Sequence, residues 1–371
     1  MSNYTLYGAP FSMYTGKAKA YLRYKEISLD DVFSSAEVYK KIIIPNTGVK
    51  FIPVVKTPDD QYIQDTSEII DQIELRHPEK PVYPSTPKQK LVSLLFELYA
   101  DEWLLIPAMH YRWNFKANFP FIHQEFGSIV APKMPAFIQI FLGKLVASRF
   151  KKVVPVLGIT PNTIPAIEKW YQEEFLAAFD HHLSNYQFLL GDAPCIGDFG
   201  LFGPLYTLLC RDPYPKKLMK AIAPNVVDWT ERMKDASDVY GDFLPNDEIP
   251  ETLYPILSDI FDTQWPVLEE TANRLSQWYS RETNNIRLGE PTKVPRTLGT
   301  HKFIIGDTEE ERRVLPYSQW MMQRPLNFYH SLNSDEQKEM EPLLKKINGL
   351  YAMRFYVKTQ ISRVNNRFVI E

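Results

Sequence analysis

Three hydroxyl side chains, those of Ser12, Tyr14 and Thr15, stand close together where an apolar segment is followed by a helix-like one. A hydroxyl in this position can accept a hydrogen bond from the first turn of the helix and so cap it. It can also donate a hydrogen bond to an anionic reactive group, which the partial positive charge of the helix N-terminus would further stabilise. The residue types alone leave both interpretations open.

Strand-like and helix-like patterns alternate over the first 80 residues, and their order decides where these hydroxyls lie. Apolar spacing and turn residues predict the order β-α-β-α-β-β-α. The strands are expected at 4–7, within 27–35, within 49–57 and at 62–64, and the helices at 15–24, 35–45 and 65–77. We expect the second helix to end at Pro45 and the third to end before Pro78.

Pro53 interrupts an otherwise apolar, β-rich run. Because proline cannot donate to a sheet ladder, a position in a central strand is disfavoured. A cis Ile52–Pro53 bond that turns the chain just before a strand would resolve the conflict. An edge strand or a loop is the alternative.

Helical patterns dominate the chain after a charged, proline-rich linker at 76–90. The length of 371 residues suffices for two or three domains. We therefore expect an α/β domain at 1–80, an all-helical domain at 81–243 and a mostly helical C-terminal extension at 244–371.

The composition excludes some classes of function. The formal net charge of −3 argues against nucleic-acid binding as the main activity. The two cysteines, Cys195 and Cys210, form neither a CxxC motif nor a metal-ligand spacing, so we expect no metal and a reducing, cytoplasmic setting. The N-terminus lacks the charged and apolar regions of a signal peptide.

One long apolar stretch, residues 134–159, is interrupted by four cations: Lys144, Arg149, Lys151 and Lys152. No apolar run reaches the ~18 residues that span a bilayer. We interpret the stretch as two segments packed in the core, and membrane contact is not expected. A basic amphipathic segment that touches a membrane surface is the alternative.

Four segments of the chain, in order, resemble those of the soluble glutathione transferases. GAPFSMYTGKAKAYL resembles the strand–loop–helix of the serine-type members, as in the phi and theta classes. FIPVV resembles the family's cis-proline element, IQDTSEII its γ-glutamyl-binding turn, and PCIGDFGLFGPLY the capping box of its helical domain. The resemblance covers roughly residues 4–235 and implies a thioredoxin-like domain followed by an all-helical one. The tail from about residue 245 resembles extensions of some long bacterial members.

The resemblance implies a glutathione site and a role for five of its residues. Ser12 takes the place of the catalytic serine, which stabilises the glutathione thiolate and does not itself act as a nucleophile. Ile52 and Pro53 would present the backbone to the cysteine of glutathione. Asp65 and Thr66, which replace the family's Glu-Ser pair, would bind the γ-glutamyl end.

Other residues near these motifs are further candidates. Lys50 could meet the glycine carboxylate of glutathione, although a solvated face is the alternative. Tyr14, Thr15 and, more weakly, Tyr7 compete with Ser12 for the sulfur, and Thr15 is also expected to cap the helix. Asp198 is interpreted as a capping residue in the core, with Cys195 in the place of the family's serine.

The second substrate is the least defined part of the prediction. Asp101 and Glu102 are interpreted as a solvated helix edge, with the cleft between domains as the alternative. The resemblance implies a homodimeric detoxification enzyme in which the glutathione thiolate attacks an electrophilic, apolar small molecule. A glutathione-dependent lyase, isomerase or dehalogenase, or a non-catalytic binding protein of the same fold, are the alternatives.

Overall fold

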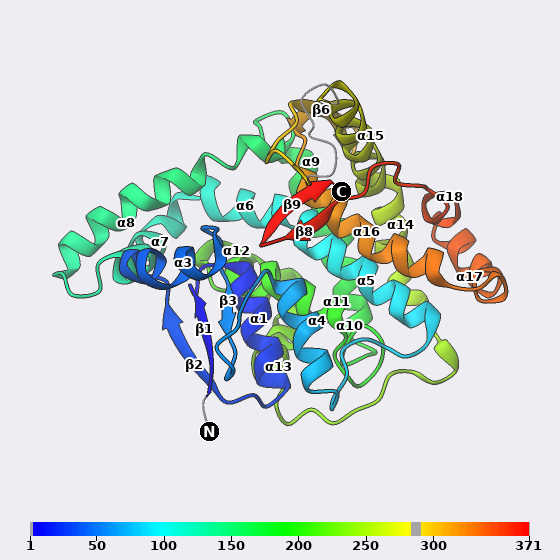
Figure 1. The fold of residues 1–371 in the computed structure, drawn as a ribbon, viewed down its shortest axis with the longest axis horizontal. Coiled ribbons are helices and arrows are strands. Elements are labelled where there is room, and N and C mark those ends of the chain that lie inside the picture. Colours follow the sequence, from blue (N-terminus) through cyan, green and yellow to red (C-terminus); the bar gives the residue numbers. More distant parts are fainter. Residues whose placement is uncertain (1–2, 283–290, 371) are drawn as a thin grey trace.

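The computed structural model describes residues 3–282 and 291–370 and has a small α/β part beside a large helical part (Figure 1). The α/β part has the predicted element order and is a thioredoxin-like domain. Its elements are β1 (Tyr4–Gly8), α1 (Met13–Tyr24), β2 (Leu29–Phe33), α2 (Ala36–Val38), α3 (Ile44–Thr47), β3 (Val54–Lys56), β4 (Tyr62–Gln64) and α4 (Thr66–Arg76).

The four strands form one mixed sheet in the order β2-β1-β3-β4. Strands β1 and β2 are parallel, whereas β3 runs antiparallel to both of its neighbours. Tyr7 of β1 is paired with Val54 of β3, and Val54 is paired with Gln64 of β4. The end of β1, the start of β3 and the end of β4 therefore meet at one edge of the sheet.

Different helices cover the two faces of this sheet. Successive side chains of a strand point to opposite faces, so each strand contributes to two separate apolar clusters. Leu6 and Val55 belong to the large core that also contains apolar residues of α1 and α4. Tyr7 and Val54 form a smaller cluster with Ile43, which lies between α2 and α3. Helix α1 is thus held against the sheet with its N-terminus at the edge described above.

The helical part begins with α5, which starts at Pro87, inside the predicted linker. Its helices are α5 (Pro87–Glu102), α6 (Leu105–Asn114), α7 (Phe119–Val130), α8 (Ala136–Lys151), α9 (Ile164–Lys169), α10 (Ala177–Leu183), α11 (Ile196–Pro204), α12 (Pro213–Ile222) and α13 (Pro224–Lys234). Gly197 and Gly200 let α11 approach the backbone of α5 closely. In this way α5 becomes the centre of the molecule, with α11 on one side of it.

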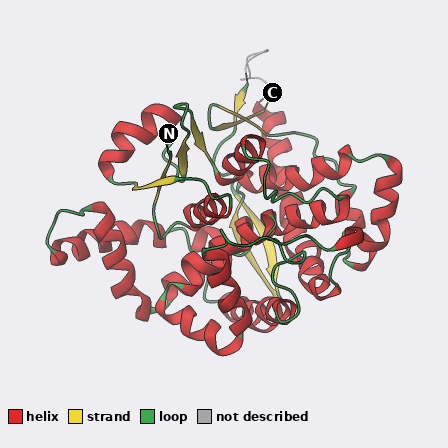
Figure 2. Ribbon diagram, turned by 90° about the horizontal axis from the view of Figure 1, so that it is seen from below, coloured by secondary structure: helices red, strands yellow, loops and turns green. Residues whose placement is uncertain are grey.

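The C-terminal extension is mostly helical, as predicted, but it also contains two small sheets that we did not predict (Figure 2). Its helices are α14 (Tyr254–Asp259), α15 (Trp265–Glu282), α16 (Pro316–Ser331), α17 (Ser334–Lys346) and α18 (Leu350–Met353). Its strands are β5 (Thr292–Lys293), β6 (Thr300–Ile305), β7 (Thr308–Arg313), β8 (Ser362–Val364) and β9 (Arg367–Ile370). Helix α16 packs against α5 and so reaches the centre of the molecule.

The predicted end of the second helix at Pro45 is wrong, because the helical segment continues to Thr47. A π-helical turn, Tyr39–Ile43, precedes α3, and Pro45 lies in the first turn of α3. Proline is tolerated there because the N–H groups of a first turn lack helical acceptors anyway. The helix ends instead at Gly48, whose φ of 70° is left-handed.

Candidate functional site

The hydroxyl of Ser12 caps α1. Its Oγ accepts a hydrogen bond from the backbone N–H of Thr15 at 3.3 Å, and its backbone is extended, with φ −95° and ψ 116°. The prediction that Thr15 provides the cap is therefore wrong. Thr15 is buried, and its own Oγ1 accepts from the N–H of Ala9 at 3.3 Å. Because the bond from Thr15 uses only a lone pair of the Ser12 oxygen, the proton of this half-buried hydroxyl can still be donated to an anion.

The Ile52–Pro53 bond is cis, as predicted, and it lies directly before β3. Pro53 is buried and Ile52 is half-buried, whereas the side chain of Lys50 is exposed on the preceding loop. The pairing of Tyr7 with Val54 places Pro53 beside the end of β1, from which the chain enters the loop of Ser12. The sheet thus brings the proline and the serine loop to the same edge.

Asp65 and Thr66 stand at the same edge, directly after β4. Asp65 caps α4 by accepting from the N–H of Ser67 at 3.1 Å, with a left-handed φ of 85°. Its other carboxylate oxygen accepts from the hydroxyl of Tyr317, on α16, at 2.9 Å. Thr66 is 1% exposed, and its Oγ1 has no hydrogen-bond partner among the described residues. Such a buried, unpaired hydroxyl is an unused donor or acceptor beside Asp65.

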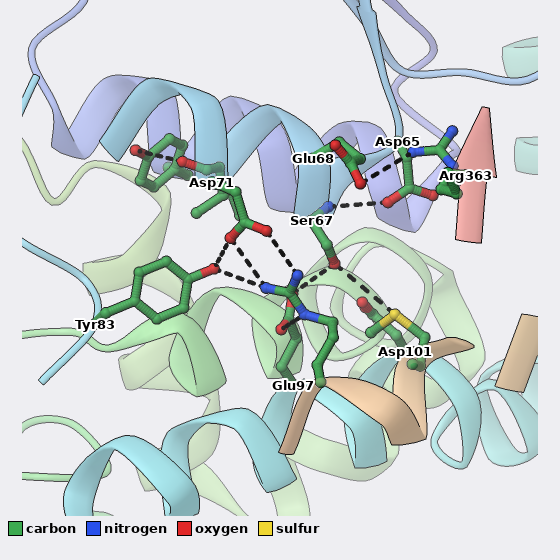
Figure 3. Close-up of polar contacts among 12 residues, drawn as sticks. Asp65, Ser67, Glu68, Asp71, Tyr83, Glu97, Asp101 and Arg363 are labelled. Carbon is green, nitrogen blue, oxygen red and sulfur yellow. Dashed lines mark hydrogen bonds and ion pairs between the residues drawn. The ribbon is translucent and has the colours of Figure 1, made fainter. Parts of the chain in front are cut away.

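A second residue of the extension, Arg363 on β8, also binds this edge (Figure 3). Its guanidinium donates to the backbone oxygen of Gln64 at 3.1 Å and to the side-chain oxygen of Gln64 at 2.7 Å. It lies 3.8 Å from the carboxylate of Glu68, in the first turn of α4. The extension therefore covers the turn for which the sequence predicts γ-glutamyl binding.

The turn between β8 and β9 makes similar contacts with the end of α3. Asn366 donates to the backbone oxygen of Thr47 at 3.0 Å, and Arg367 donates to that of Gly48 at 3.3 Å. These residues line a cavity of about 440 Å³, together with Lys293 of β5. The extension is thus fixed to the thioredoxin-like domain on both sides of the loop that carries Pro53.

A network of buried charges lies under this edge (Figure 3). Lys17 of α1 binds Glu97 at 2.8 Å and Asp101 at 2.6 Å, and all three side chains are almost fully buried. The hydroxyl of Ser67 donates to Glu97 at 2.8 Å. Arg324 of α16 donates to Glu97 at 3.1 Å. Glu97 of α5 is therefore shared by the sheet domain, the helical part and the extension.

The same charges shift the pKa values of the network. Burial alone would raise the pKa of Glu97, but Arg324 and Lys17 outweigh burial and lower it to about 2. Burial alone would lower the pKa of Lys17, but Asp101 and Glu97 raise it. Burial raises the pKa of Asp101, and the negative charge of Glu97 adds to the effect. Glu97 is thus the ionised member that holds both cations in place.

Asp101 and Glu102 are buried, so their interpretation as a solvated helix edge is wrong. Burial raises the pKa of Glu102 to about 8, although the hydroxyl of Ser318 donates a hydrogen bond to it. Tyr14 donates to the backbone oxygen of Asp101 at 3.4 Å. Burial raises the pKa of Tyr14, and the charges of Glu102, Asp101 and Asp65 raise it further. The structure thus brings Tyr14 and Asp65 into one buried acidic cluster.

Tyr7 points away from this cluster. It belongs to the smaller core under α2 and α3, where burial and the neighbouring Tyr62 raise its pKa. Asp198, as predicted, caps a core helix. Its carboxylate accepts from the N–H groups of Leu189 at 3.1 Å and Cys195 at 2.9 Å, and from the indole of Trp229 at 3.3 Å.

Residues 6–81 match the family model described as "Glutathione S-transferase, N-terminal domain". This range contains the serine loop, the cis-proline and the capped start of α4. This part of the chain is therefore similar to the N-terminal domain of the glutathione S-transferase superfamily. The resemblance found in the sequence is thereby confirmed for the N-terminal domain. None of the curated proteins matches the chain.

Solved structures of this superfamily are similar to the chain at low identity. A transferase of Methylobacterium radiotolerans, in complex with glutathione sulfonate, is 18% identical, with a TM-score of 0.39, and the match covers 67% of this chain and 99% of that one. A Tau-class transferase of mango is 17% identical, with a TM-score of 0.43 and coverages of 68% and 96%. A GST-like protein of Pseudomonas syringae is 15% identical, with a TM-score of 0.42 and coverages of 85% and 97%.

Sequence reasoning missed the residues that the extension contributes. Tyr317, Arg324 and Arg363 reach the site from more than 200 residues away along the chain. Of these three residues, only Arg324 could have been suspected from the sequence. It follows the apolar residues Trp320 and Met321 in a helix whose sequence indicates burial. An arginine in such a helix requires a carboxylate partner.

Proposed function

We propose that this chain binds glutathione at the edge of the sheet and stabilises its thiolate with Ser12. One observation carries the proposal: the register Tyr7–Val54–Gln64 gathers the serine loop, the cis-proline and Asp65 at one edge. The N-termini of α1 and α4 lie there too, and each adds N–H groups and partial positive charge. Such an arrangement suits a ligand that carries both a thiolate and a carboxylate, as glutathione does.

The residues divide this task by their chemistry. Ser12 donates to the thiolate, while Asp65 pairs with the α-amino group and the unpaired hydroxyl of Thr66 binds the γ-glutamyl carboxylate. Ile52 offers its backbone to the cysteine of glutathione, and Lys50 faces the glycine carboxylate. Lowering a thiol pKa of ~8.5 by two units requires ~2.7 kcal/mol. A charge-assisted hydrogen bond of ~1.5–3 kcal/mol supplies most of this.

The thiolate would attack an electrophilic, apolar small molecule, which makes the chain a glutathione transferase. Lyase, isomerase and dehalogenase reactions use the same thiolate and belong to the same proposal. Homodimer formation, a cytoplasmic location and a role in detoxification stay predictions from the resemblance.

A non-catalytic binding protein is the second candidate. It is favoured by the contacts of Tyr317 with Asp65 and of Arg363 with Gln64, which cover the γ-glutamyl turn. In that case glutathione or a related peptide binds, but no thiolate forms at neutral pH.

The ultraviolet absorbance of the bound thiolate distinguishes the two candidates. We expect calorimetry to detect glutathione binding, a bound-thiol pKa below 7.5, and a rise of about one to two units in Ser12→Ala. Ser35→Ala is the matched control, because Ser35 caps α2 with the same 3.3 Å bond to a backbone N–H. Absence of binding at millimolar glutathione refutes the site itself. Binding with an unshifted thiol pKa in the unmodified chain supports the second candidate.

The same measurement tests which hydroxyl faces the sulfur. If Ser12→Ala leaves a lowered thiol pKa unchanged, the role of Ser12 is refuted. Tyr14→Phe and Thr15→Val then assign the role among the remaining hydroxyls.

A further inference from the structure

The outer face of α8 carries large apolar side chains that nothing in the described structure covers. Helices α7 and α8 form a hairpin at the edge of the molecule, on the left in Figure 1. Our prediction that this stretch is packed in the core holds for its second segment, where Val154, Leu157 and Ile159 are buried, but in α8 it holds only for the inner face. There Gly143 and Ala147 are buried, and a Cβ on Gly143 would collide with the backbone oxygen of His123 on α7.

The exposed side chains form a continuous stripe. Phe137 is 73% exposed, Phe141 61% and Leu145 51%, and their spacing of four residues places them on one face of the helix. Met134 and Ile140, 51% and 45% exposed, extend the stripe. Single exposed apolar residues are common, but a contiguous stripe of aromatic and aliphatic side chains marks an interaction surface.

The charges of the segment that carries the stripe all have one sign. Residues 131–153 contain no aspartate or glutamate and five cations, all of them exposed: Lys133, Lys144, Arg149, Lys151 and Lys152. Three of the five lie in the last turn of α8 or directly after it. The rest of the chain is slightly acidic, since the whole chain has a net charge of −3. The positive charge is therefore concentrated beside the apolar stripe.

We propose that this face of α8 docks onto an anionic lipid surface, with the helix lying in the plane of the interface. Phe137, Phe141 and Leu145 would enter the boundary between headgroups and acyl chains, while the cations would bind the lipid phosphates. An apolar face flanked by Lys and Arg, without acidic residues, is the pattern of interfacial helices. The docking is peripheral, and none of the described helices is long and apolar enough to cross a membrane.

Charge complementarity favours an anionic lipid surface over a second copy of the chain as the partner of this face. In a two-fold dimer through the stripe, Lys144 at the middle of α8 would lie near the axis and face its own copy. Neither copy would offer a carboxylate from this segment to pair with it. An anionic membrane instead neutralises every cation of the segment.

Co-sedimentation with vesicles tests the proposal. The full chain is mixed with vesicles of phosphatidylcholine containing about 30% phosphatidylserine, and with vesicles of phosphatidylcholine alone. We expect binding to the anionic vesicles, at least tenfold weaker binding to the neutral ones, and weakening as salt rises from about 0.05 M to about 0.5 M.

Two variants separate the apolar and the charged contributions. The variant with Phe137→Ser and Phe141→Ser should lose binding without unfolding, because both side chains are exposed. Its control is Leu75→Ser with Tyr356→Ser, at side chains that are 85% and 75% exposed elsewhere. The variant with Lys144→Gln, Lys151→Gln and Lys152→Gln should bind about a hundredfold more weakly at low salt, at roughly fivefold per cation.

The control for the charge variant neutralises Lys338, Lys345 and Lys346 on α17, which lies at the opposite end of the view in Figure 1. It should bind like the unmodified chain. Absence of binding to anionic vesicles, or equal losses in the α8 variants and their controls, overturns the proposal. A dimer that forms without vesicles and dissociates in Phe137→Ser with Phe141→Ser also overturns it, and assigns the face to a second copy.

Discussion

Replacing Arg324 by glutamine should destabilise the protein, because Arg324 connects the extension to two carboxylates of the preceding chain. Its guanidinium binds Asp71 through two bonds, at 2.7 and 3.1 Å, and Glu97 at 3.1 Å. The side chain of Glu97 is 1% exposed, so its charge cannot be solvated when a cation is removed. That of Asp71 is 39% exposed and can be hydrated instead.

The magnitude follows from the pKa of Glu97, which falls from its ordinary 4.5 to about 2. This interval corresponds to about 3.4 kcal/mol, at about 1.36 kcal/mol per unit. Burial opposes Arg324 and Lys17, so the attraction of Arg324 exceeds a half share of this interval and is at least about 1.5–2 kcal/mol. The pair with the half-exposed Asp71 adds about 0.5–1 kcal/mol. We therefore expect Arg324→Gln to lower the free energy of unfolding by about 2–3 kcal/mol near pH 7.

The loss should depend on pH in one direction. A carboxylate whose pKa is lowered in the folded state contributes stability above its unfolded pKa, and this contribution is lost as the pH falls. The difference between the unmodified chain and Arg324→Gln should thus be full above pH 5. It should shrink as the pH falls from 4.5 toward about 2.

Urea unfolding, followed by tryptophan fluorescence at pH 7.5 and pH 3.5, measures both effects. The control is Arg354→Gln, which removes a 2.8 Å ion pair with Glu341 whose arginine side chain is 59% exposed. This surface pair should cost under about 0.5 kcal/mol. Equal losses in the two variants, or a loss from Arg324→Gln that is as large at pH 3.5 as at pH 7.5, would refute the reasoning.

Two further substitutions test other buried carboxyl groups. Because the pKa of Glu102 is raised from 4.5 to about 8, the unfolded chain loses this proton first as the pH rises, and stability falls between those values. Glu102→Gln should therefore flatten the decline of the urea midpoint from pH 5 to pH 8, and a parallel curve would contradict the assignment. Asp198→Ala should cost roughly 3–5 kcal/mol in the same assay, because it leaves the buried N–H groups of Leu189, Cys195 and Trp229 without their acceptor. A loss below about 1 kcal/mol would contradict its capping role.

The sequence predicted the thioredoxin-like domain well because its elements are set by local patterns. Short β-rich runs bounded by turn residues mark its strands, and the apolar spacing of Ile69, Ile70 and Ile73 marks α4. The cis bond before Pro53 was predictable because a proline at the start of a strand leaves few conformations. The cap at Ser12 was assigned to the wrong hydroxyl, because two hydroxyls three residues apart give the same signal and only the backbone of Ser12 is extended.

The environment of the site could not be predicted, because its partners are distant in the chain. Asp65 and Tyr317 are 252 residues apart, and no periodicity connects them. Asp101 and Glu102 resembled a solvated edge because two adjacent carboxylates are usually exposed. Their burial becomes intelligible only once Lys17 and Ser318 are placed beside them.

These contacts also bear on how the chain folds. One buried carboxylate, that of Glu97, connects the three sections into which we divide the sequence. Glu97 lies in the helical section and binds Lys17 of the first section and Arg324 of the extension. Domains that fold alone are separated where few contacts cross. If one section folded alone, its charged side chain would be buried without a partner. Otherwise that side chain would be exposed together with the apolar surface around it. The extension is therefore part of the core that supports the site, and a change in α16 acts on the site through Glu97 and Asp65.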